Sequence, residues 1–148
     1  MTSKTYSTIS ALCAYVSSFI VIAAVLAAHA YGLVFTPGEY EAAPPTVSRL
    51  LVDPVVAGPF ALAMIVAALF LTFAVLRIVA TLSVFISLGA GGRRIRWAFL
   101  AVMLVSELVA IAGMIVLSQY TGGVDSRMHD RGSYMLFFGH AIGIASGG

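Results

Sequence analysis

The chain has 148 residues, of which 61% are hydrophobic and 9% charged, with a formal net charge of +2 and a mean hydropathy of +1.04. Soluble domains carry about 25% charged residues. This composition therefore cannot cover a water-facing surface and predicts an integral membrane protein. The small net charge gives no reason to expect nucleic acid as a partner, and the single cysteine, Cys13, excludes an intrachain disulfide and a cysteine-rich metal site.

The first predicted span covers residues 11–33. Its apolar run is longer than the roughly 7–15 residues of a signal-peptide core and supplies the about 20 helical residues that cross a bilayer, so we expect an uncleaved helix. Residues 34–56 then form a first outer loop, because four of the five prolines lie there and prevent a continuous helix.

Three further spans follow in chain order. Residues 57–88 contain no turn signal after Ala61 and predict one long helix, and a short loop at 89–96 carries three arginines. The next span, 97–119, is bracketed by the interfacial aromatics Trp97 and Tyr120. A solvated outer loop at 120–132 precedes a last apolar stretch at 133–148, which falls about four residues short of a full crossing. The predicted fold is an all-α bundle of four transmembrane helices in a single domain.

The basic residues predict the orientation of the bundle. Five of them fall on the side of the N-terminus and three on the opposite side: Lys4, Arg77, Arg93, Arg94 and Arg96 against Arg49, Arg127 and Arg131. The positive-inside rule then places the N-terminus in the cytoplasm. We expect a plasma membrane or a bacterial inner membrane.

Two charged residues fall inside the predicted spans. Glu107 lies near the middle of 97–119, and Arg77 lies toward the cytoplasmic end of 57–88. A charge at this depth is costly unless it is paired or hydrated, so we predict an intramembrane ion pair between Arg77 and Glu107. The alternative is that Arg77 extends to the headgroups while Glu107 is protonated or bonds a hydroxyl such as that of Thr81 or Ser83.

Two histidines, His29 and His140, also lie inside predicted spans. Imidazole is a common axial ligand of haem iron, and a single histidine can hold the magnesium of a chlorophyll. The interpretation that we favour for each histidine is a hydrogen bond to a neighbouring helix. We expect no cofactor, with haem or chlorophyll on His29 or His140 as the alternative.

Small residues recur at four-residue spacing in two of the spans. Gly139, Gly143 and Gly147 form a GxxxGxxxG run in the last one, and alanines including Ala24 and Ala28 do the same in the first. Such faces let helix backbones approach closely in lipid. They predict a helix-packing surface toward the same chain or a partner.

Two longer stretches carry a family resemblance: PPTVSRLLVDPVVAGPF at 44–60 and MHDRGSYMLFFGHAIGI at 128–144. Both are similar to landmarks of the DRAM/Sfk-type (damage-regulated autophagy modulator-like) family of polytopic membrane proteins. The resemblance implies a helical membrane fold with no defined enzymatic activity. It maps family landmarks to Pro45, Ser48 and His129, and it implies about six spans, more than this chain can hold.

The sequence contains no nucleophile elbow, P-loop, HExxH or dinucleotide fingerprint, so we predict no catalytic residues, no metal site and no enzyme. We expect an accessory, structural or assembly subunit of a larger membrane complex. Its partners would be lipids and other membrane subunits, or a second copy through the glycine-rich last helix. The alternatives are an electron-transfer or light-harvesting subunit using His29 or His140, and a small proton-coupled transporter element using Glu107 and Arg77.

Overall fold

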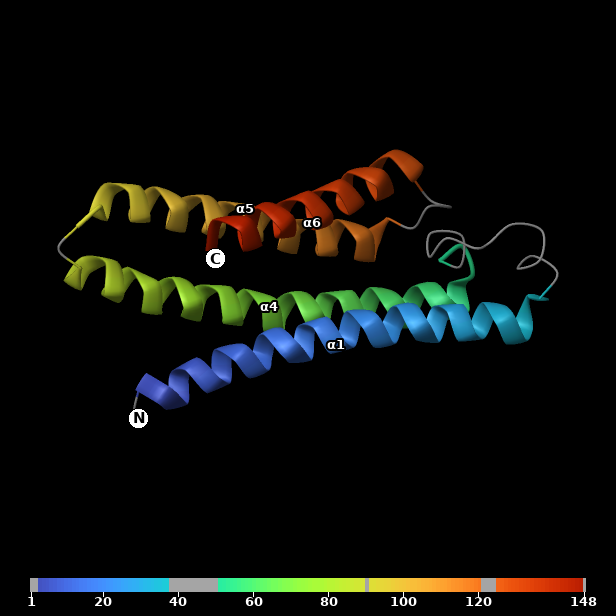
Figure 1. Ribbon diagram of the computed structural model, residues 1–148. Coiled ribbons are helices and arrows are strands. Elements are labelled where there is room, and N and C mark those ends of the chain that lie inside the picture. Colours follow the sequence, from blue (N-terminus) through green and yellow to red (C-terminus); the bar gives the residue numbers. More distant parts are fainter. Residues whose placement is uncertain (1–2, 38–50, 90, 121–124, 148) are drawn as a thin grey trace.

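The computed structural model describes residues 3–37, 51–89, 91–120 and 125–147. It contains four long helices, α1 (Ser3–Phe35), α4 (Pro54–Leu88), α5 (Arg93–Gln119) and α6 (Ser126–Gly147), and the described residues include no strand (Figure 1). Three of the helices are long and apolar enough to cross a membrane, over Thr8–Phe35, Pro54–Leu88 and Arg93–Gln119. The protein therefore has an all-helical, membrane-spanning architecture.

The helices extend into the segments that the sequence predicts as loops. α5 begins at Arg93, inside the predicted 89–96 loop, after a reversal at Gly92, whose φ of 64° lies in the left-handed region that favours glycine. Of the first outer loop, residues 38–50 lie outside the described residues. α4 then starts at Pro54, three residues before the expected 57.

The largest difference from the predicted loops is at the start of α6. The helix begins at Ser126, so residues 126–132 are helical where the sequence predicts a loop. Asp125 caps this end, because its Oδ1 accepts hydrogen bonds from the backbone amides of Arg127 (3.0 Å) and Met128 (3.1 Å). Hydropathy marks where an apolar span begins, whereas a side-chain cap marks where the helix begins, and here a polar two-turn segment separates them.

One carboxylate joins the end of α1 to the start of α4. Asp53 precedes α4 as its N-cap, and its Oδ1 accepts from the amide of Val55 at 2.9 Å. Its Oδ2 accepts from the Tyr31 hydroxyl at 3.1 Å, from the last turns of α1. Pro54 occupies the first helical position, where its missing N–H costs nothing. Asp53 therefore links the described ends of α1 and α4 at this end of the bundle.

Helices that follow one another in the chain pack on one another: α1 on α4, α4 on α5, and α5 on α6 (Figure 1). The main core lies toward the end where α4 begins and α5 ends. It is formed by Ala28, Leu51, Val56, Phe60, Met64, Ala67, Ala68, Ile111, Met114 and Leu117, and Leu136 of α6 packs against it. A smaller cluster of Ile86, Leu100 and Met103 joins α4 and α5 near the opposite end. Packing is thus concentrated in one half of the bundle.

We expect Asp53→Ala to destabilise the protein by about 1 kcal/mol, because the α4 cap and the Tyr31 contact are lost together. Asp53→Asn retains a capping oxygen and should lose much less. Thermal unfolding in detergent, followed by circular dichroism, measures both. Equal destabilisation by the two variants would contradict the capping role.

Candidate functional site

The most distinctive polar feature inside the bundle is a carboxylate–histidine pair. Glu107 lies near the middle of α5 and is only 6% exposed. Its Oε2 is 2.9 Å from Nδ1 of His140 on α6. A buried carboxylate in a membrane-spanning helix needs a partner, and His140 supplies it. When Glu107 is ionised and the imidazole is neutral, Nδ1 carries the proton and donates it, which leaves the lone pair on the second ring nitrogen, Nε2.

Glycines bring α6 close enough for this contact. A Cβ atom on Gly139 would stand 2.7 Å from the carbonyl oxygen of Ser106 and 2.8 Å from the amide of Ala110. A Cβ atom on Gly143 would collide with the Glu107 carboxylate itself. Both glycines are buried. The two helices therefore meet backbone to backbone, which only glycine permits, and the carboxylate occupies the space that a side chain at position 143 would take.

Two further glycines belong to this close contact between α5 and α6, the seam, and were not singled out from the sequence. A Cβ on Gly113 of α5 would stand 2.5 Å from the amide of Leu136 and 2.7 Å from the carbonyl of Gly132. Gly132 in turn lies against Val116 and Leu117. The sequence did contain a signal for Gly132, because it precedes Gly139 by seven residues, or two helical turns, and so lies on the same face of the helix.

The structure places the remaining predicted site residues on separate helices. Glu107 meets His140, whereas the sequence expected Arg77, a half-buried residue of α4. The hydroxyls of Thr81 and Ser83 donate to carbonyls of their own helix, those of Arg77 and Ala80, so neither hydroxyl is the donor to Glu107. The Arg77–Glu107 ion pair stays a prediction.

The histidines differ in their surroundings. His29 is half-buried on α1, which packs on α4, whereas His140 lies on α6, which packs on α5. His129 is buried, and its Nδ1 lies 3.0 Å from the carbonyl oxygen of Tyr120, so the expectation of solvent around it is wrong. Within the described ranges, no group of three or more His, Cys, Asp and Glu residues can hold a metal ion.

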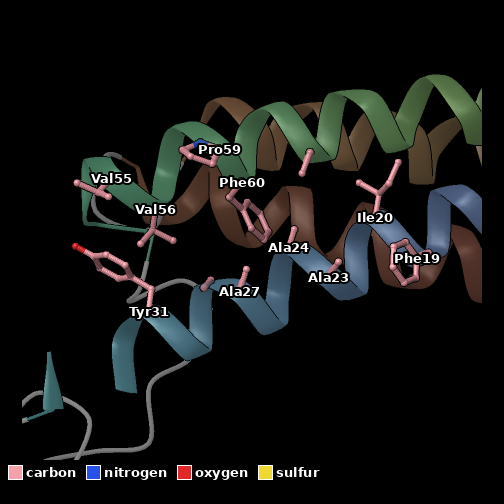
Figure 2. A pocket seen from close by; sticks show the side chains of 12 residues that line it. Phe19, Ile20, Ala23, Ala24, Ala27, Tyr31, Val55, Val56, Pro59 and Phe60 are labelled. Atoms are coloured by element: carbon pink, nitrogen blue, oxygen red, sulfur yellow. The ribbon is translucent and has the colours of Figure 1, made fainter. Parts of the chain in front are cut away.

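An apolar groove of about 460 Å³ lies between α1 and α4. Figure 2 shows alanines of α1 along its floor, with Phe19 toward one end and Tyr31 toward the other. Ala28 is buried, Ala24 is half-buried, and Ala23 and Ala27 are exposed. No charged residue lines the groove, whose lining consists of Phe19, Ile20, Ala23, Ala24, Ala27, Ala28, Tyr31, Val55, Val56, Pro59, Phe60 and Ala63.

Comparison with protein-family models, with curated proteins and with solved structures gives no match to this chain. The resemblance to the DRAM/Sfk-type family stays a prediction. Of its landmarks, Pro45 and Ser48 lie outside the described residues, and His129 lies in the first turns of α6.

We expect Gly139→Ala and Gly143→Ala each to destabilise the protein by about 1–3 kcal/mol, because the added methyl group forces α5 and α6 apart. Gly58→Ala is the matched control: it lies inside α4 with nothing within 4 Å of its Cβ position, so alanine there should be neutral or stabilising by up to about 1 kcal/mol. Thermal unfolding in detergent compares the three. Equal effects at 58, 139 and 143 would rule out the backbone contact as the cause.

We also expect a double-mutant cycle on Glu107→Gln and His140→Ala to show a coupling free energy of about 0.6–1.7 kcal/mol, the range for polar contacts between membrane helices. The same cycle with Arg77→Ala in place of the histidine variant should give a smaller coupling, because the 2.9 Å contact is to His140. Reversible unfolding in mixed micelles measures both. A larger coupling free energy between Glu107 and Arg77 than between Glu107 and His140 would show that Arg77 is the main partner of Glu107.

Proposed function

We propose that this chain is a non-enzymatic, multi-pass membrane protein that works as an accessory, structural or assembly subunit of a larger membrane complex. The N-terminus would face the cytoplasm, in agreement with the basic residues near it and at the start of α5. The absence of a catalytic motif from the sequence supports a role in packing rather than chemistry.

α6 serves in this proposal as a fourth membrane element. It runs antiparallel to α5, since Gly132 lies opposite Val116 and Gly147 opposite Met103. The thirteen residues of α5 between these contacts span about 20 Å, which is about two thirds of a hydrocarbon core. The first turns of α6 carry the charged residues Arg127, Asp130 and Arg131, which favours placing these turns in the outer headgroup region.

The observation that carries the proposal is the apolar groove of α1 and α4. Of the most hydrophobic stretch of each span, only 11% is buried in α1, against 44% in α5. Exposure to lipid is normal for a membrane helix and does not by itself indicate a partner. A groove lined by alanines, however, is the kind of surface on which another transmembrane helix packs closely. The glycines of α6 are occupied by α5, so we place the partner contact on the groove rather than on the last helix.

Filling the groove tests this role. We expect the chain to purify from its native membranes in mild detergent with a stoichiometric membrane partner, and a photo-crosslinker at Ala23 to reach that partner. Ala27→Trp should abolish both results, because the indole would occupy the groove. Leu26→Trp is the matched control, since Leu26 is its exposed neighbour on α1 and does not line the groove.

Two results would contradict the proposal. One is a chain that purifies alone, as a monomer, under conditions that keep other complexes of the same membrane intact. The other is an Ala27→Trp variant that keeps its partner as well as Leu26→Trp does.

A further inference from the structure

We propose that His140, held in place by Glu107, is the axial ligand of a planar metal macrocycle of the haem or chlorophyll type, bound on the exposed side of α6. This inference goes beyond the accessory role and does not rest on it. Three observations support it: the hydrogen bond between Glu107 and His140, the exposure of the His140 imidazole, and the lack, among the described residues, of the further ligands that a bare metal ion needs.

The first argument is the hydrogen bond itself. Histidines that bind metals almost always donate their second ring N–H to a carboxylate, a carbonyl or water, which fixes the tautomer and raises the basicity of the ligating nitrogen. Nδ1 of His140 stands 2.9 Å from Oε2 of Glu107. With this proton committed to the carboxylate, the lone pair of Nε2 is available to a metal.

The second argument is that the arrangement is rigid on one side and open on the other. The Glu107 side chain is 8% exposed and is confined by Gly143, whereas the His140 side chain is 45% exposed. His129 provides the contrast within the same helix, because it makes a comparable contact to a carbonyl but is buried. His140 thus combines a fixed ring orientation with access from outside the bundle.

The third argument concerns the kind of metal centre. A bare ion such as zinc needs at least three protein ligands, and the described residues contain no group of three that could supply them. A metal already held in the plane of a macrocycle needs only an axial ligand, and histidine is a common one. A lone, buttressed histidine therefore fits a macrocycle and does not fit a bare ion.

The surface beside His140 suits a flat, apolar ligand. Phe137 and Ile144 lie one turn away on either side, at the i−3 and i+4 positions that share a helix face, and they are 70% and 62% exposed. No Asp, Glu, Lys or Arg occurs between Ser133 and Gly147. A macrocycle bound at Nε2 would cover aromatic and aliphatic side chains without burying a charge.

The test titrates the purified full chain in detergent with hemin and, separately, with zinc protoporphyrin, which stands in for a magnesium macrocycle. We expect a Soret band shifted from that of protein-free micelles. Glu107→Gln, which disturbs only the positioning residue, should weaken binding about 10- to 100-fold, and His140→Ala, which removes the ligand, should weaken it at least as much. His140→Met offers a different ligand atom and should move the Soret maximum while the fold is kept.

His29→Ala is the matched control and should bind as the unchanged chain does. Binding of hemin alone would assign an iron centre, and binding of zinc protoporphyrin alone a magnesium-type centre. The proposal is overturned if the unchanged chain gives the spectrum of protein-free micelles, or if a folded His140→Ala variant binds both probes with undiminished affinity. Retention of the partner in the groove experiment would be unaffected by either result.

Discussion

The structure depends most on the contact between the backbones of α5 and α6. Helices that pack through ordinary side chains stay 8–10 Å apart, and a side chain at position 143 would take the space that the Glu107 carboxylate occupies. Gly139 meets the backbone at Ser106 and Ala110, and Gly113 meets Gly132. This close approach encloses Glu107 and brings His140 within hydrogen-bonding distance of it. The position of the polar pair therefore depends on the four glycines of the contact, Gly113, Gly132, Gly139 and Gly143.

The rest of the bundle is held together differently. In the main core, large buried side chains such as Phe60 and Met64 of α4 and Met114 of α5 pack into one cluster. α1 packs on this core through Ala28 and partly buried apolar neighbours. Two hydrogen bonds add to the contact: the Ser17 hydroxyl donates to the carbonyl of Ala67 at 2.8 Å, and the Tyr31 hydroxyl donates to Asp53. Because α1 is joined by hydrogen bonds and small residues, it leaves the groove beside α4 open.

Hydropathy and proline placement predict the order of the four long helices in the described part of the chain, because within lipid a helix satisfies the backbone hydrogen bonds of each span. The start of α6 was missed because its first two turns are polar and Asp125 caps them. The partner of Glu107 was missed for another reason. Residue counting gives the depth of a side chain but not its direction around the helix axis, and direction is what brings His140 to Glu107.

Direction around the axis also connects packing with chemistry at this site. Gly143 belongs to the close-packed seam, and the space above its Cα atom is the space that the Glu107 carboxylate fills. A larger residue at 143 would separate the helices and displace the carboxylate from Nδ1 of His140 in the same step. The glycine run that reads as a packing signal in the sequence is therefore also what positions the histidine. In this protein, the tightness of one helix pair decides whether the His140 imidazole is held in one orientation by Glu107 or left free to rotate.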